Sequence, residues 1–116
     1  MRIFLLVAVL VGLPVQAEAQ ATFLSGNDLV TYMREWDKYH AGQSSYNRAT
    51  VGTVQGYIAA SSDAYSAVGV ICSPENVTVD QAAAVVASYL KSHPTEWHFA
   101  AVGLVRDALK EAFPCG

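Results

Sequence analysis

The chain has 116 residues, of which 53% are hydrophobic, 10% aromatic and 15% charged. The charged share is well below the roughly 25% of an ordinary soluble domain. The formal net charge is -3 at pH 7, and the lysines and arginines stand singly along the chain. Because no basic run is present, nucleic acid is a poor candidate partner.

The excess of hydrophobic residues lies at the N-terminus. A basic residue precedes an unbroken apolar run over residues 3–11, which is too short for a membrane span of roughly 20 residues. A short apolar segment followed by small residues is typical of a secretory signal peptide. The sequence therefore predicts a signal peptide over residues 1–19, with cleavage after Ala19 or Ala21. Residues 22–116 are then expected to form one exported domain with no membrane span, periplasmic in a bacterium.

The first two predicted helices span about residues 27–39 and 46–68. In the first, a run of capping residues precedes an apolar face. That face carries Leu29, Met33, Trp36 and His40. In the second, apolar positions recur every 3.6 residues, although Gly56 lowers the helix propensity. We interpret Gly56 and Ala60 as small residues that let a neighbouring helix cross closely.

Two more helices are predicted over about residues 78–92 and 95–112. Thr78 and Gln81 have the spacing of a capping box at the start of the third helix, and Pro94 separates the third helix from the fourth. The apolar face of the fourth helix carries Trp97, Ala101, Leu104 and Ala108. No segment shows the alternation typical of strands, so we expect an all-α fold, a compact bundle of about four helices.

The two cysteines, Cys72 and Cys115, are the only ones in the chain. In an exported protein such a pair is most simply a disulfide. The alternative is a pair of metal ligands, but the sequence clusters no further ligands around them. We therefore expect one disulfide that links the C-terminus to the middle of the chain.

Candidate catalytic groups are scattered. His93 and His98 are five residues apart, which does not suit two ligands on one helix face, and His40 lies far away in the sequence. We therefore predict no metal site and no cofactor. An enzyme would need a pocket that joins Asp63 to a histidine, whereas the simpler interpretation of Asp63 is a carboxylate on the polar face of its helix. The sequence thus predicts binding surfaces and no enzymatic activity.

A series of short motifs runs through the second half of the chain. These are Gly56-Tyr57-Ile58, Asp63-Ala64, Cys72-x-Pro74, Asn76-Val77-Thr78, Val85-Val86-Ala87-x-Tyr89-Leu90, His93-Pro94 and Ala108-Leu109-x-x-Ala112-Phe113-Pro114-Cys115. In order and spacing they resemble the Rap/Tai immunity family, whose members protect bacteria against peptidoglycan amidase effectors delivered by type VI secretion. Residues 25–54 match weakly. Many relatives carry a cysteine in the first helix and another where Val54 stands here, so the chain resembles a diverged member.

The resemblance implies a small all-helical periplasmic protein, often a homodimer, that blocks the amidase by occupying its substrate cleft. Such an inhibitor needs a rigid scaffold that holds a preordered loop. Two loops are candidate partner-binding segments. The first consists of Ser73, Pro74, Glu75 and Asn76, and the second of Ser92, His93, Pro94, Thr95 and Glu96. The alternative for each loop is a plain interhelical connection, and the alternative function is a periplasmic chaperone or envelope-stress binding protein.

Overall fold

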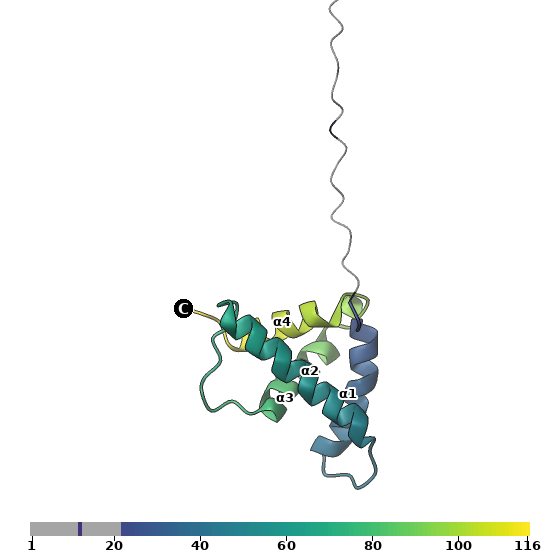
Figure 1. Ribbon diagram of the computed structural model, residues 1–116. Coiled ribbons are helices and arrows are strands. Elements are labelled where there is room, and N and C mark those ends of the chain that lie inside the picture. The colour runs from purple at the N-terminus through teal and green to yellow at the C-terminus, as the bar shows by residue number, and fades with distance from the viewer. Residues whose placement is uncertain (1–11, 13–21) are drawn as a thin grey trace, which may run out of the picture.

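The computed structural model describes residue 12 and residues 22–116, and its helices surround one core (Figure 1). In chain order they are α1 (Gly26–His40), α2 (Arg48–Ala67), α3 (Val79–Ser92) and α4 (Ala101–Ala112), with a short 3-10 helix, η1 (Pro94–Glu96), before α4. The described residues contain no β-strand, so the prediction of an all-α bundle of about four helices is confirmed. The predicted signal peptide, residues 1–19, lies outside the described residues except at Gly12.

The first three helices begin and end within two residues of their predicted bounds. Ahead of α1, the hydroxyl of Ser25 accepts a hydrogen bond from the backbone N–H of Asp28, and the Asp28 carboxylate accepts one from the N–H of Ser25. Thr78 and Gln81 form the same reciprocal pair ahead of α3. These capping boxes satisfy N–H groups that the first turn of a helix leaves without partners, which explains why the starts were predictable.

The prediction of one continuous helix over residues 95–112 is wrong. The chain forms η1, turns, and begins α4 only at Ala101, because residues 97–100 pair with the segment that enters α1. The N–H of Gly26 donates to the carbonyl of Phe99 at 2.7 Å, and the N–H of Ala101 donates to the carbonyl of Leu24 at 3.0 Å. Trp97 therefore lies outside α4, and its predicted place on the helical face is wrong as well.

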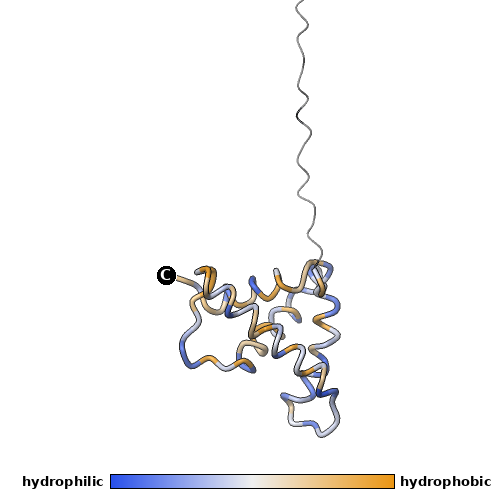
Figure 2. Tube along the Cα trace, viewed as in Figure 1, coloured by the Kyte–Doolittle hydropathy of each residue, from blue (hydrophilic) through white to orange (hydrophobic). Residues whose placement is uncertain are grey.

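The core lies between the four helices and consists mainly of aliphatic side chains around Trp36. Its members are Leu29, Met33, Trp36, Val51, Val54, Ile58, Ile71, Ala82, Ala83, Val86, Ala87, Leu90, Ala101, Leu104, Val105, Ala108 and Leu109. In Figure 2 hydrophilic residues appear in the connections between helices and also along α1.

The interpretation of Gly56 and Ala60 as a close helix crossing is wrong. Ala60 is exposed, and a Cβ atom added at Gly56 would meet nothing within 4 Å. The helix α2 packs instead through Val51, Val54 and Ile58, which lie on another face. The two small residues therefore face solvent and make room for no neighbouring helix.

The predicted disulfide joins Cys72 to Cys115, with the two Cα atoms 5.0 Å apart. It fixes the C-terminal residues to the connection between α2 and α3, residues 68–78. This connection, which we call the arc, lies at the same end of the molecule as the C-terminus (Figure 1). The N–H of Cys72 donates to the carbonyl of Phe113 at 2.9 Å, so a backbone hydrogen bond accompanies the covalent link.

Candidate partner-binding surfaces

The two predicted loops lie at opposite ends of α3. The first loop, residues 73–76, precedes this helix, and the second loop begins at Ser92, the last residue of α3, and continues through His93 into η1. A helix of 14 residues is about 21 Å long at 1.5 Å per residue. The structure therefore does not bring the two loops together into one site.

The first loop is exposed at its tip and fixed at its base. Pro74, Glu75 and Asn76 are exposed, whereas the disulfide at Cys72 ties the preceding residue to the C-terminus. The N–H of Val77 donates to the carbonyl of Pro74 at 3.3 Å, which closes a tight turn. A loop held in this way loses less conformational entropy when a partner binds it.

The second loop is fixed by its own side chains. The His93 ring stacks on the Tyr89 ring with the centroids 3.9 Å apart, and its Nδ1 atom lies 2.7 Å from the Tyr89 carbonyl oxygen. The Tyr89 hydroxyl donates to the Glu96 carboxylate at 3.3 Å. Burial raises the pKa of Tyr89, and the negative charge of Glu96 raises it further, so the phenol stays protonated and can donate. Pro94 and Thr95 are left exposed at the tip.

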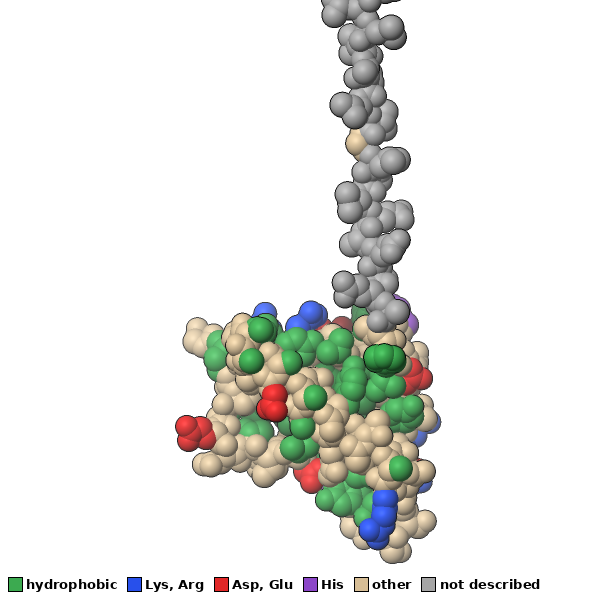
Figure 3. All heavy atoms as spheres, in the orientation of Figure 1, with side chains coloured by type: hydrophobic (Ala, Val, Ile, Leu, Met, Phe, Trp, Pro, Cys, Tyr) green, Lys and Arg blue, Asp and Glu red, His purple; other side chains and the backbone are tan. Residues whose placement is uncertain are grey.

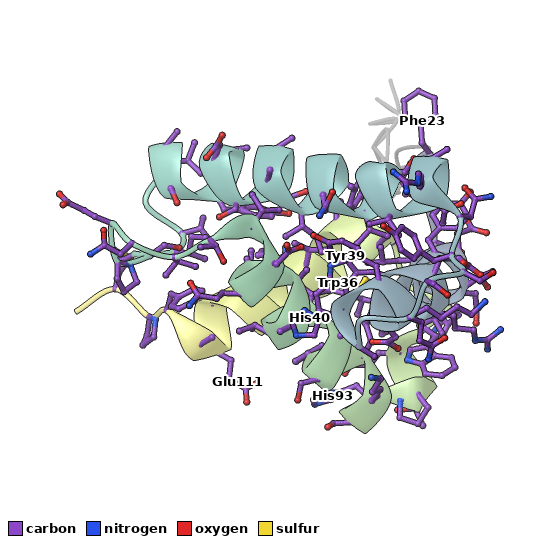
Figure 4. The ribbon with its side chains drawn as sticks, turned by 90° about the horizontal axis from the view of Figure 1, so that it is seen from below. Phe23, Trp36, Tyr39, His40, His93 and Glu111 are labelled. Atoms are coloured by element: carbon purple, nitrogen blue, oxygen red, sulfur yellow. A yellow bond between two sulfur atoms is a disulfide. The ribbon has the colours of Figure 1, made fainter. Side chains whose placement is uncertain are left out.

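A shallow groove of about 540 Å³ lies beside the second loop, between α3 and α4. We call it the α3–α4 groove. Its lining residues are mostly small: Ala84, Val85, Ser88, Tyr89, Ser92, His93, Ala108, Glu111 and Ala112. In Figure 4 His93 and Glu111 project from the same side of the molecule, one from the end of α3 and the other from α4.

A second cavity, of about 280 Å³, lies beside the first loop, and we call it the loop cavity. It is lined by the end of α2, the loop itself and the start of α3. Its lining residues are Ala59, Ser62, Asp63, Ser66, Ser73, Pro74, Val77, Thr78, Val79 and Ala82. The predicted segment at residues 73–76 therefore forms part of a concave surface, which sequence reasoning did not foresee.

The groups that an enzyme or a metal site would need are separated. Each histidine lies against an aromatic ring close to it in the sequence: His40 stacks on Trp36, His93 stacks on Tyr89, and the His98 ring is tilted against the Phe99 ring. None of the three lines the loop cavity beside Asp63. Within residues 22–116, no three histidine, cysteine, aspartate or glutamate side chains are grouped in a way that could hold a metal ion. His40 is the last residue of α1 and is exposed.

Sequence reasoning missed a polar network centred on Asp80. Its carboxylate accepts hydrogen bonds from Trp36 Nε1 at 3.0 Å, from Gln55 Nε2 at 3.0 Å and from the Tyr39 hydroxyl at 3.4 Å. Burial acts to raise the pKa of Asp80, but these hydrogen bonds and the nearby His40 outweigh it and hold the pKa below its usual value. The partners lie 25 to 44 residues away in the sequence, so no local motif could have indicated the network. Figure 4 shows Trp36, Tyr39 and His40 grouped on α1.

The fold and its surfaces define a small disulfide-linked helical domain with two preordered, exposed loops, an architecture suited to binding another protein. No helix in residues 22–116 is both long and apolar enough to cross a membrane. The family model of the Rap1a immunity proteins matches residues 25–115, and the chain belongs to this family. The match includes the whole of the helical domain, including residues 25–54, where the sequence motifs were weak. An immunity role, and hence a protein effector as the partner, follow from this membership. The comparisons with curated proteins and with solved structures gave no significant match.

Proposed function

We propose that the protein is exported to the periplasm, where it binds and inhibits a peptidoglycan amidase effector delivered by type VI secretion. The observation that carries the proposal is the match to the Rap1a immunity family over residues 25–115. The order and spacing of the motifs in the second half of the chain, which resemble those of the Rap/Tai proteins, support the amidase as the class of target.

Export is supported by the disulfide and by the N-terminal sequence. Disulfides persist in oxidising compartments such as the bacterial periplasm and are rare in the cytosol. Both cysteines of this chain are exposed, so reductants of the cytosol would have access to them. Peptidoglycan is also a periplasmic substrate, and an inhibitor of its hydrolysis is useful only in the compartment where the effector acts.

The domain inhibits the amidase by fitting into its substrate cleft, which requires a complementary shape and no catalysis by the domain. The exposed tip of the first loop or of the second loop is inserted into the substrate cleft of the amidase and keeps peptidoglycan out. Both tips are preordered, the first by the disulfide and the turn at Pro74 and the second by the stack of His93 on Tyr89. Preordering lowers the entropy lost on binding, which favours tight inhibition.

Growth rescue tests the function. Candidate type VI amidases from the same genome are directed to the periplasm of a test bacterium, together with the full chain or with a variant that lacks residues 2–19. We expect the full chain to restore growth against one of the amidases and the variant to give no protection. Protection against none of them, or equal protection by the cytoplasmic variant, would contradict the proposal.

Loop exchange identifies the loop that contacts the amidase. In one variant Glu75 and Asn76 are changed to Gly and Ser, and in the other Pro94 and Thr95 are changed in the same way. We expect one of the two variants to bind the amidase at least about tenfold more weakly in calorimetry, which corresponds to about 1.4 kcal/mol. Unchanged affinity in both variants would exclude the loops as the inhibitory segments.

A further inference from the structure

The loop cavity lies in a part of the chain that has no basic residue. Between Arg48 and Lys91 the sequence contains no lysine, arginine or histidine, but it contains Asp63, Glu75 and Asp80. On the face shown in Figure 3, acidic side chains stand over α2 and at the edge formed by the arc, and basic ones lie toward the margins. The surroundings of the loop cavity are therefore negative.

Asp63 is the charged residue in the cavity lining, and it has no counter-ion. Its side chain makes no hydrogen bond or ion pair with any of residues 22–116, whereas Asp37 pairs with Lys91, Glu35 with Lys38 and Asp107 with Arg106. Asp63 stands one turn before the end of α2, whose last turn contains no basic residue. The carbonyl end of a helix carries a partial negative charge, so the helix adds to the negative potential and does not offset it.

The other polar groups of the cavity favour a hydrogen-bond donor. Ser62, Ser66 and Ser73 are among the lining residues, and the Oγ atom of Ser73, which is buried, has no hydrogen-bond partner in the described part of the chain. The Thr78 side chain already accepts from the N–H of Gln81, and the Thr78 N–H donates to the Gln81 side chain. The start of α3 therefore offers few free donors to an anion, which Asp63 would also repel.

From these contacts we propose that the loop cavity receives a lysine or arginine side chain of the protein partner. The cationic group pairs with the Asp63 carboxylate and donates to the serine hydroxyls, while its aliphatic stem packs on Val77, Val79 and Ala82. Ser73 and Pro74 belong both to the first loop and to the cavity wall, so a partner that touches the loop tip can also reach the cavity. The identity of that partner as an amidase rests on the proposed function, but the chemistry of the cavity does not.

A titration without any effector tests the cavity itself. The isotope-labelled mature protein, with its disulfide intact, is titrated with n-butylguanidinium, and n-butylurea serves as the neutral analogue of similar shape. We expect amide shifts in the NMR spectrum at residues 59–66 and 73–82 with the cation only. Asp63→Asn should weaken binding about 1.5- to fivefold, the range expected when one exposed charge pair is lost. The matched control is Glu111→Gln, which removes an equal charge on α4 outside the cavity and should leave binding unchanged.

Shifts that are scattered over the surface, equal binding of the urea, or equal binding by Asp63→Asn would overturn the proposal. The variant should fold normally because Asp63 is exposed and its side chain makes no hydrogen bond or ion pair with residues 22–116, and an unchanged melting temperature checks this. With an amidase that binds the wild type, Asp63→Asn should again weaken affinity about 1.5- to fivefold. If no amidase binds the wild type, the proposed function fails, and the titration still decides the nature of the cavity.

Discussion

Asp80 links three helices through one carboxylate. It lies in the first turn of α3 and accepts hydrogen bonds from Trp36 on α1 and from Gln55 on α2. Trp36 is one of the largest fully buried side chains, and its indole N–H would otherwise be buried without a partner. Hydrogen bonds to a charged group each contribute about 1.5 to 3 kcal/mol, so this residue stabilises the packing of all three helices.

The lowered pKa of Asp80 predicts a loss of stability in acid. Because the pKa lies below its usual value, folding favours the ionised carboxylate. This contribution is complete above the unfolded pKa of about 3.9 and is lost as the pH falls through the folded pKa. We expect Asp80→Ala to lower the free energy of unfolding by about 2 kcal/mol at pH 7, and by a smaller amount at pH 3. Urea unfolding at the two pH values measures this, and an equal loss at both would contradict the assignment.

Two serines allow the contribution of a side-chain hydrogen bond to the free energy of unfolding to be measured. Ser61 is buried, and its hydroxyl donates to the carbonyl of Tyr57 at 2.7 Å, whereas the Ser73 hydroxyl has no partner among the described residues. We expect Ser61→Ala to cost about 1 kcal/mol of unfolding free energy and Ser73→Ala to cost nothing measurable. Thermal unfolding distinguishes them. A clear loss in Ser73→Ala would mean that its hydroxyl is satisfied in solution, which would also weaken the argument for the loop cavity.

At the scale of single elements, sequence motifs predicted the helix starts that are determined by interactions between residues close together in the sequence. The starts of α1 and α3 were readable because a capping box is made by residues three apart. The start of α4 was not readable, because it depends on hydrogen bonds between residues 97–101 and residues 24–27, and these segments are far apart in the sequence. The glycine at position 26 is consistent with this close contact between the two segments. A Cβ atom there would lie 2.5 Å from the carbonyl oxygen of Trp97, so only glycine fits.

Gly26 and Gly56 therefore predict opposite outcomes for the same substitution. Gly56→Ala places a methyl group in open space on a helix, and the higher helix propensity of alanine should stabilise the protein by about 0.5 to 1 kcal/mol. Gly26→Ala drives a methyl group into the backbone of Trp97 and should destabilise it by about 1 to 3 kcal/mol. The melting temperatures should rise and fall accordingly. A loss in Gly56→Ala would show that a neighbouring segment approaches this face of α2.

At the scale of the whole molecule, the sequence predicted the components of the candidate site but not their arrangement. The exposed tips of both loops were readable from proline and from the position of Cys72. The separation of the loops along α3 and the cavity beside Asp63 depend on how α2, α3 and the arc pack, which no periodicity encodes. From the sequence, Asp63 was interpreted as an ordinary surface carboxylate. The structure shows that it lines the loop cavity together with Ser73 and Thr78.

The disulfide is the contact whose loss should affect the entire domain. It joins residues that are 43 positions apart, and in the chain-entropy model a closed loop of this length contributes up to about 4 kcal/mol. A small domain has a total stability of about 5 to 15 kcal/mol, so the double variant Cys72→Ser and Cys115→Ser should melt at a much lower temperature. The control is dithiothreitol, which should lower the melting temperature of the wild type and leave that of the variant unchanged.

Hydrogen exchange then locates the effect. We expect amides of residues 69–78 and of the C-terminal residues after α4 to exchange faster in the double variant, because the disulfide and the Cys72 to Phe113 hydrogen bond hold these segments together. Amides in the middle of α1 should change only in proportion to the global stability. If the arc stays protected without the disulfide, its shape is fixed by packing alone. In that case reduction in the cytosol would not disable the first loop, and the proposed restriction of inhibition to the periplasm would have to come from export and not from oxidation.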